Sequence, residues 1–252
     1  MNKFSQISAE HYDAFNAKKN YQKECRIIEK YFFEPTDTKQ NNILDLGCGS
    51  GSHLSYFLHK NYQIHGIDIS ADMIELAKKK YASINNASLF FEVSDLLNIK
   101  LAADQYSNVI SMYSVLGYFQ NHKSLQKIFE TVYVGLMSGG RFIFDVWDEE
   151  TVLNLGPSDR VKHAQYGDSI IMRKSKSVLK KNKKTVDVKF NYYKDGKKIY
   201  EEAVHTIKFY STQYIISLAK CSGFEIKEVI KHPHADALDE DGWNALYILE
   251  KL

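Results

Sequence analysis

Cysteine is scarce in this chain, and the common cysteine motifs are missing. The 252 residues include three cysteines, Cys25, Cys48 and Cys221, which are widely spaced and form no CxxC pair. Such a pattern is typical of a reducing cytoplasm and provides no metal site. We therefore expect a cytoplasmic protein without a bound metal.

Long apolar runs and a surplus of one charge are missing too. No apolar run reaches the roughly 18 residues of a membrane-spanning helix, and the first residues lack the apolar segment of a signal peptide. The net charge is only +2, whereas a nucleic-acid-binding domain is expected to be basic as a whole. These absences argue against a membrane protein and against a nucleic-acid partner. The length suits one α/β domain with an added segment.

A glycine-rich loop follows the first strongly apolar segment. Residues 43–46 have the pattern of a buried parallel strand, and Gly47, Gly49 and Gly51 alternate directly after it. Glycines at this spacing allow a tight turn and let a ligand approach the backbone closely. The next segment, residues 52–58, is apolar on one face and is predicted to be a helix. Strand, loop and helix together predict the opening unit of a nucleotide-type binding fold.

Two kinds of α/β fold use such a loop. The dinucleotide fingerprint G-x-G-x-x-G requires glycine where this chain has Ser52. The pattern that starts at Asp45, D-x-G-x-G-x-G, instead resembles motif I of the class I S-adenosylmethionine-dependent methyltransferases. The resemblance implies S-adenosylmethionine as the cofactor, in contact with Gly47, Cys48 and Gly49. Asp45 is expected to order the loop rather than to contact the ligand.

Acids follow the next two predicted strands. Residues 62–68 end in Asp68, just before a helix that Ser70 is expected to cap, and residues 89–93 lead into Asp95. Open α/β sheets bind ligands at these strand ends, although an acid there also commonly caps a turn. The resemblance implies that Asp68 accepts the ribose hydroxyls and that Asp95 holds the adenine. The further cofactor contacts that it implies are Ile69, Met73, Ser94, Leu96 and Met112.

Four more predicted strands complete the sheet, and two more predicted helices pack against it. The strands cover residues 107–113, 141–146, 224–230 and 245–249. One helix covers residues 125–136 and is closed by Gly139-Gly140, and the other runs from Ser211 to Gly223. The expected fold class is therefore α/β, with a Rossmann-like seven-stranded, mostly parallel sheet and helices on both faces. We expect a helical cap at residues 1–36, a methyltransferase core at 37–150 and 211–252, and an inserted segment at 151–210.

The inserted segment is predicted to form an antiparallel β flap after the fifth strand. Alternating residues suggest three strands, at 169–172, 185–192 and 199–210, and Asp195-Gly196 is a strong hairpin signal. Such a flap would roof the pocket. Between residues 173 and 198 it carries eleven Lys or Arg residues. These could seat a nucleotide-sugar diphosphate or a nucleic-acid backbone, or could simply keep exposed edge strands from pairing.

The amino-terminal segment extends the resemblance. Tyr12-Asp13 followed by Lys19-x-Tyr21-x-x-Glu24 resembles the cap of small-molecule methyltransferases, particularly the TDP-amino-sugar N-methyltransferases. The match implies that Tyr12 faces the acceptor and that Tyr21 helps to hold the carboxylate of the cofactor.

The segment after the fourth strand resembles the same enzymes. Residues 112–118 match their pattern, except that Tyr118 stands where they carry histidine, and Trp147 falls where they have an aromatic pair. The match implies substrate contacts for Ser114 and Trp147, and our hypothesis is that Tyr12 and Tyr118 are the catalytic residues, which hydrogen-bond and orient the acceptor. An unperturbed tyrosine titrates near about 10, so no ready base is present, which favours an amine acceptor over a hydroxyl.

Three functions stay open on this basis. The first is N-methylation of a small molecule, of which a nucleotide-linked amino sugar is one example. The second is O-methylation of a sugar or another metabolite, with a base supplied by one of four histidines: His163, His205, His232 or His234. The third is a non-catalytic protein that only binds the cofactor. The expected partner is a small-molecule acceptor, and the chain is expected to be a monomer or a homodimer.

Overall fold

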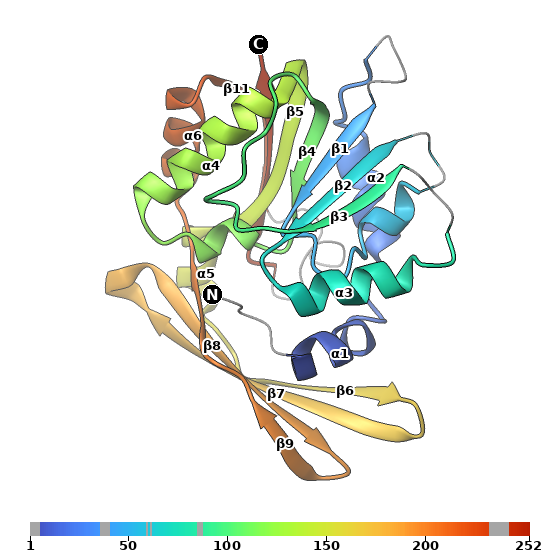
Figure 1. Ribbon diagram of the computed structural model, residues 1–252. Helices are drawn as coiled ribbons and strands as arrows, with labels where there is room; N and C mark the ends of the chain where they lie inside the picture. Colours follow the sequence, from blue (N-terminus) through green and yellow to red (C-terminus); the bar gives the residue numbers. More distant parts are fainter. Residues whose placement is uncertain (1–5, 36–40, 59, 61, 85–87, 232–241) are drawn as a thin grey trace.

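The chain folds into a sheet with helices on both faces and a second, separate sheet beneath it (Figure 1). The computed structural model describes residues 6–35, 41–58, 60, 62–84, 88–231 and 242–252. Among these residues, none of the helices has the length and apolar character needed to cross a membrane. His232 and His234, considered above as possible bases, lie outside the described residues.

The core sheet has seven strands in the order β11-β12-β5-β4-β1-β2-β3. All neighbouring pairs from β5 to β3 are parallel, whereas β12 is antiparallel to both β5 and β11. The predicted seven-stranded, mostly parallel sheet is thereby confirmed. The strands are β1 (Asn42–Leu46), β2 (Gln63–Asp68), β3 (Leu89–Val93), β4 (Tyr106–Ser111), β5 (Leu136–Trp147), β11 (Phe224–Lys231) and β12 (Asn244–Lys251).

Helices cover both faces of this sheet, as predicted (Figure 1). On one face lie α2 (Tyr21–Glu29) and α3 (Ala71–Lys80), and on the other lie α4 (His122–Gly135) and α6 (Thr212–Cys221). The hydroxyl of Ser70 accepts a hydrogen bond from the amide of Met73 and caps α3. The hydroxyl of Ser211 caps α6 in the same way. Both predicted helix starts are correct.

Two predicted helical features of the core are wrong. Residues 52–58 do not form an α-helix but a short 3₁₀ turn, η2 (Leu54–Tyr56), which buries Leu54 in the few residues available before β2. Helix α4 ends at Gly135 rather than at the Gly139-Gly140 pair. Leu136 is buried and extended, pairing with Tyr106 of β4, so both glycines belong to β5.

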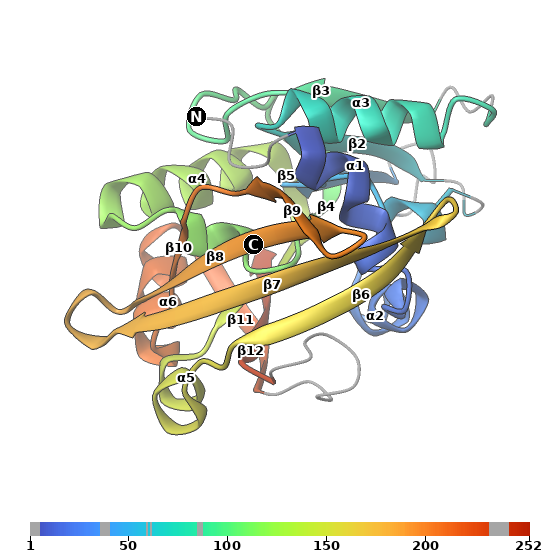
Figure 2. The same cartoon turned by 90° about the horizontal axis from the view of Figure 1, so that it is seen from below.

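The flap is a second antiparallel sheet of five strands rather than three. It consists of β6 (Arg160–Tyr166), β7 (Ser169–Lys180), β8 (Thr185–Lys194), β9 (Lys197–Glu201) and β10 (His205–Lys208). The predicted turn at Asp195-Gly196 is confirmed, with φ angles of 48° and 78° that suit a two-residue hairpin. Seen from below, the flap crosses the underside of the core sheet (Figure 2).

Helix α1 (Gln6–Phe15) joins the flap to the core (Figures 1 and 2). Phe15 packs with Ile171 of β7 and Tyr192 of β8 in a small apolar cluster. The hydroxyl of Ser8 donates a 2.5 Å hydrogen bond to Glu202, in the link between β9 and β10. The flap is therefore fixed over the carboxyl edge of the core sheet, where α/β folds bind their ligands.

Candidate active site

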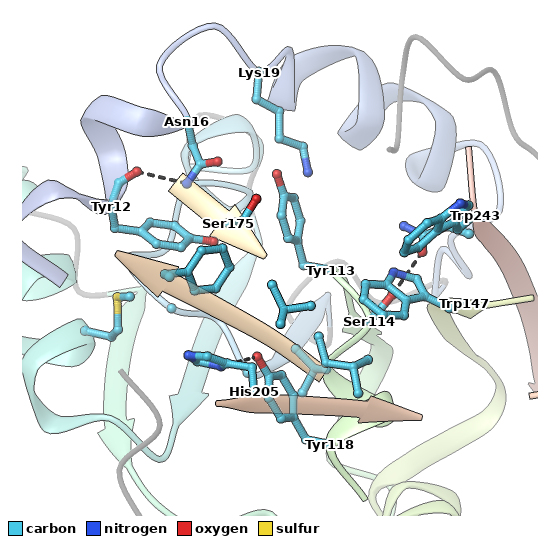
Figure 3. A pocket seen from close by; sticks show the side chains of 18 of the residues that line it. Tyr12, Asn16, Lys19, Tyr113, Ser114, Tyr118, Trp147, Ser175, His205 and Trp243 are labelled. Atoms are coloured by element: carbon cyan, nitrogen blue, oxygen red, sulfur yellow. Dashed lines mark hydrogen bonds between the residues drawn. The ribbon is translucent and has the colours of Figure 1, made fainter. Parts of the chain in front are cut away.

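A cavity of about 700 Å³ lies between the carboxyl edge of the core sheet and the inner face of the flap (Figure 3). Its volume is in the range of small-molecule and cofactor sites. Of the residues predicted for the site, the following line this cavity: Tyr12, Gly47, Gly49, Asp68, Ile69, Met73, Asp95, Leu96, Ser114, Tyr118 and Trp147.

The glycine loop and the end of β2 form one hydrogen-bonded unit. The amides of Gly47 and Cys48 donate to the carbonyl oxygen of Ile67, at 2.7 and 3.0 Å. Asp68 then accepts from the amide of Gly49 at 2.9 Å and from the amide of Ser70 at 2.8 Å. Burial raises the pKa of Asp68, although the backbone hydrogen bonds from Ser70 and Gly49 oppose the rise. Asp68 thus orders the loop and also faces the cavity.

Asp95 closes a turn after β3 and also lines the cavity. One of its carboxylate oxygens accepts a 2.9 Å hydrogen bond from the amide of Leu97, which closes the turn after β3. The residue nevertheless lines the cavity together with its neighbour Leu96. Because β2 and β3 are adjacent and parallel, both acids lie at the same edge of the sheet.

The segment after β4 is held in a strained conformation at the cavity wall. Tyr113 and Ser114 have φ angles of 73° and 53°, a left-handed region that side chains rarely adopt. Asp145 accepts a 3.0 Å hydrogen bond from the amide of Ser114, and Asn244 accepts a 2.9 Å bond from its hydroxyl. Contacts from β5 and β12 therefore fix this turn so that Tyr113 faces the cavity.

A buried charge cluster connects the amino-terminal segment to the glycine loop. Glu24 of α2 contacts Nζ of Lys19 and Nε2 of His53, both at 2.9 Å. Burial lowers the pKa of His53, although its hydrogen bond to Glu24 opposes this effect. The ammonium group of Lys19 also lies 3.2 Å from the ring centre of Tyr113 (Figure 3). Lys19, the first residue of the Lys-x-Tyr-x-x-Glu pattern, is thereby held in the cavity wall.

Tyr118 does not stand alone in the cavity wall. Its hydroxyl lies 2.9 Å from Nδ1 of His205, and both residues line the cavity (Figure 3). Nε2 of His205 is 3.5 Å from Glu202, which also accepts hydrogen bonds from Ser8 and Tyr192. Burial, followed by the charge of Glu202, raises the pKa of Tyr118. Among the histidines considered from the sequence, His205 thus lies in the site, whereas His163 is exposed on the flap.

The inner face of the flap contributes cations to the cavity. Arg160 and Lys162 of β6 and Arg173 of β7 line it, together with Ser175 and Ser177. Lys162 and Arg173 are direct cross-strand partners. Among the described flap residues that line the cavity, none is acidic.

Most of the basic residues between 173 and 198 lie away from the cavity. Within this fully described segment, Arg173 is the single lysine or arginine in the cavity wall. Lys180 pairs with Asp187, and Lys189 pairs with Glu201. Successive side chains of a strand point to opposite faces of the sheet, so the basic residues are divided between the two faces of the flap. A count of charges along the sequence does not reveal this division.

Four of the predicted cofactor residues are not among the cavity-lining residues, and their role as contacts stays a prediction. Met112 and Cys48 are buried in the core cluster beside β1, and the thiol of Cys48 points toward Gly66. Tyr21 packs edge-on against His53, with ring centres 5.0 Å apart. Ser94 follows β3, and its amide donates to the carbonyl oxygen of Asp68.

Trp243 closes the other end of the cavity. Its ring meets that of Trp147 edge-on, with centres 5.0 Å apart (Figure 3). Both tryptophans line the cavity, and Trp243 is buried. Trp147 thus pairs with a tryptophan from a segment almost a hundred residues further along the chain, just before β12.

The comparisons with known proteins point in one direction. Residues 43–140 match the family model described as "Methyltransferase domain". The chain is 26% identical over 126 residues to the "Putative methyltransferase YqeM" of Bacillus subtilis, covering 50% of each chain. It is 28% identical over 107 residues to a dTDP-3-amino-3,4,6-trideoxy-alpha-D-glucopyranose N,N-dimethyltransferase of Streptomyces venezuelae, covering 42% of this chain and 43% of the relative. The chain thus spans about half the length of these curated relatives.

The fold is also found among solved structures. The structure of S-adenosylmethionine-bound CalS10, an amino pentose methyltransferase from Micromonospora echinaspora, superimposes with a TM-score of 0.71. The match covers 100% of this chain and 99% of that chain at 14% sequence identity. At this identity the likeness concerns the fold, and it includes the flap as well as the core.

Proposed function

Residues 43–140 form a methyltransferase domain of the class I S-adenosylmethionine-dependent type, and from this premise we propose that the protein methylates an amine of a small molecule. The observation that carries the proposal is the joint position of the glycine loop, Asp68 and Asp95 on one cavity that continues under the flap. A cofactor end and an acceptor end are thus available within about 700 Å³.

The residues at the core end of the cavity fit S-adenosylmethionine. Asp68 offers a carboxylate for the ribose hydroxyls, and Asp95 with Leu96 offers a polar and an apolar contact for the adenine. A side chain built at Gly49 would meet nothing within 4 Å, so the loop leaves open space for a ligand. Lys19 offers a cation for the carboxylate of the methionine part. When bound, the cofactor supplies an electrophilic methyl group on a sulfonium.

The protein's own contribution to the transfer is positioning. Tyr12 from α1 and Tyr118 after β4 present their side chains to the cavity from different elements (Figure 3). They would hydrogen-bond the acceptor and align it with the methyl carbon, while the flap excludes water. Trp147 and Trp243 bound the acceptor end with apolar surface.

The basic inner face of the flap supports an acceptor that carries an anionic group. Lys162 and Arg173 face each other across β6 and β7, and Arg160 lies on the same face. Like charges that are direct cross-strand neighbours repel. A phosphate or diphosphate between them would accept their hydrogen bonds. A nucleotide-linked amino sugar would place its diphosphate here and its amine toward Tyr118.

O-methylation is the second candidate, and one observation favours it. His205 lines the cavity and touches Tyr118, so a base is available for an acceptor hydroxyl. The amine is preferred because two curated relatives methylate dTDP-amino sugars, although they match only part of this chain.

The test is methyl transfer to dTDP-3-amino-3,4,6-trideoxy-α-D-glucopyranose and to related amines, with the corresponding hydroxy sugars as paired acceptors. We expect S-adenosylhomocysteine to form together with an amine product that is heavier by one methylene group. Transfer to the hydroxy sugar alone would favour the second candidate. Cofactor binding without transfer to any acceptor of either kind would point to a non-catalytic protein.

A further inference from the structure

We propose that His205, oriented by Glu202, accepts the proton of the acceptor through the hydroxyl of Tyr118. This inference rests on the proposed function, because it concerns the same acceptor end of the cavity. It assigns to the flap a catalytic task in addition to covering the pocket: Tyr118 touches the acceptor, His205 takes the proton, and Glu202 is a positioning residue.

The three groups form a continuous contact from the cavity into the protein. The hydroxyl of Tyr118 is 2.9 Å from Nδ1 of His205, and Nε2 on the other side of the ring is 3.5 Å from Oε2 of Glu202. The side chains of His205 and Glu202 are 2% and 1% exposed. The 3.5 Å contact is long for a hydrogen bond, but such bonds in catalytic sites often tighten when the substrate binds.

Glu202 is arranged as an acceptor that stays ionised. Burial opposes its ionisation, but hydrogen bonds from His205 and Ser8 outweigh this effect and keep its pKa below the usual value. The hydroxyl of Ser8 donates to Oε1 at 2.5 Å, and the hydroxyl of Tyr192 donates to Oε2 at 3.1 Å. An ionised carboxylate can only accept hydrogen bonds. It therefore favours the histidine tautomer with hydrogen on Nε2, which leaves the lone pair of Nδ1 facing Tyr118.

The surroundings of the pair come from several elements. After burial, the groups whose charges raise the pKa of Tyr118 are Glu202, Tyr12 of α1, Asp68 of β2 and Tyr192 of β8. Phe190 of β8 packs against the His205 ring, with centres 5.5 Å apart. The guanidinium of Arg173 lies over the Phe190 ring, 4.8 Å from its centre. Within this set Glu202 is the anion in contact with the imidazole, so it stabilises the imidazolium once that forms.

The proton balance is simple. An acceptor amine reaches the site as an ammonium ion, which has no lone pair. One N–H proton passes to the oxygen of Tyr118 while the phenol proton passes to Nδ1 of His205, and the electron pair stays on the acceptor nitrogen. That pair then forms the bond to the methyl carbon as the carbon–sulfur bond breaks toward sulfur. The imidazolium proton leaves to solvent after the products depart. A hydroxyl acceptor would use the same path during its attack.

A purely structural role for these contacts would explain why His205 and Glu202 are buried, but not why Tyr118 and His205 reach the cavity wall. Glu202, Ser8 and Tyr192 connect the flap to α1, and a connection of this kind needs no group in the cavity wall. Yet Tyr118 and His205 both line the cavity. The proton path therefore starts where the acceptor must lie and ends at His205, which a buried anion supports.

The first test needs no acceptor. Long-range ¹H–¹⁵N NMR of the wild-type protein with S-adenosylhomocysteine identifies which nitrogen of His205 carries hydrogen in the neutral form. We expect hydrogen on Nε2, with assignment by comparison with His205→Gln. Hydrogen on Nδ1 would overturn the proposal, because His205 would then donate to Tyr118 and could not take its proton.

The second test is the pH dependence of kcat/KM with dTDP-3-amino-3,4,6-trideoxy-α-D-glucopyranose. We expect His205→Gln to lose about 10²-fold or more near neutral pH, the usual contribution of such a base, and to recover as rising pH deprotonates the amine in solution. Glu202→Gln should show a smaller loss with the same recovery, and the exposed His163→Gln should match wild type. A loss that is equal at every pH would overturn the proposal and leave only a structural role.

The outcomes separate this inference from the proposed function. If the wild type methylates none of the acceptors, the proposed function fails while the tautomer measurement still decides the orientation of His205. If the wild type is active and His205→Gln binds S-adenosylmethionine with the same affinity, a difference between their pH profiles is due to loss of the proton acceptor and not to loss of the cofactor.

Discussion

The amide of Gly49 donates a 2.9 Å hydrogen bond to Oδ2 of Asp68, which ties the glycine loop to the end of β2. The other carboxylate oxygen accepts from the amide of Ser70 at the start of α3. One side chain therefore orders two of the segments that line the cofactor end of the cavity. Such preorganisation lowers the entropy cost of binding.

Two glycines of the loop should respond differently to alanine. A Cβ at Gly47 would lie 2.6 Å from Val115, whereas one at Gly49 would meet nothing within 4 Å. Both residues have positive φ angles, so each alanine costs about 1–2 kcal/mol of backbone strain. We expect Gly47→Ala to lose more thermal stability, and Gly49→Ala to lose cofactor affinity with a smaller drop in Tm. Equal losses of stability would contradict this distinction.

Asp45 should make stability depend on pH. It is buried in β1, and burial, followed by the charge of Asp68, raises its pKa from 3.8 to about 8. The folded state therefore binds this proton more tightly than the unfolded chain. The resulting stability is complete below 3.8 and is lost as pH rises through about 8.

Asp45→Asn should remove this pH dependence while keeping the size of the side chain. Urea denaturation at several pH values in that window should show a slope of at most about 1.4 kcal/mol per pH unit that wild type has and the variant lacks. The exposed Glu75→Gln serves as the control and should keep the wild-type slope. Parallel curves for wild type and Asp45→Asn would show that Asp45 is not the group responsible.

The inner face of the flap should bind thymidine diphosphate. Lys162 lines the cavity, whereas Lys174 on β7 points to the other face, since β-strand side chains alternate. A hydrogen bond to a charged group is worth about 1.5–3 kcal/mol, so Lys162→Gln should weaken binding by about tenfold or more. Lys174→Gln should bind like wild type in the same calorimetric titration. Equal weakening by both changes would indicate a general charge effect.

Tyr12 should contribute one hydrogen bond to the acceptor. Tyr12→Phe keeps the ring and removes the hydroxyl, so we expect kcat/KM to fall by up to about tenfold with the cofactor affinity unchanged. Tyr166→Phe removes a hydroxyl that bonds Glu10 at the surface and serves as the control. If Tyr12→Phe and Tyr118→Phe together leave kcat/KM unchanged, neither hydroxyl orients the acceptor.

Much of the core could be predicted because its signals are local. Each strand is a short apolar run, and the glycines and acids follow directly after the strands, so Gly47, Gly49, Asp68 and Asp95 were found together. The errors in the core arise where tertiary contacts, rather than the local sequence, decide whether a residue joins a helix or a strand. Leu136 continues a helical pattern in the sequence, but its burial beside Tyr106 makes it the first residue of β5.

The acceptor end was predictable only in part because its contacts join distant segments. Tyr118 and His205 are 87 residues apart, and Ser8 and Glu202 are 194 residues apart. No spacing in the sequence indicates which of several histidines meets Tyr118. The alternation of side chains along β6 and β7 distinguishes Lys162 and Arg173, which face the cavity, from the lysines on the outer face. This distinction requires the pairing register of the two strands, which the sequence does not show.

The most direct test of the account is calorimetric titration with S-adenosylmethionine and S-adenosylhomocysteine, using wild type, Asp68→Ala and the surface control Glu75→Ala. We expect micromolar binding by wild type and by the control, and a loss of about a hundredfold or more in Asp68→Ala, because the ribose contact and the order of the glycine loop are removed together. Binding that is undiminished in Asp68→Ala, or absent in wild type, would contradict the cofactor site described for this cavity.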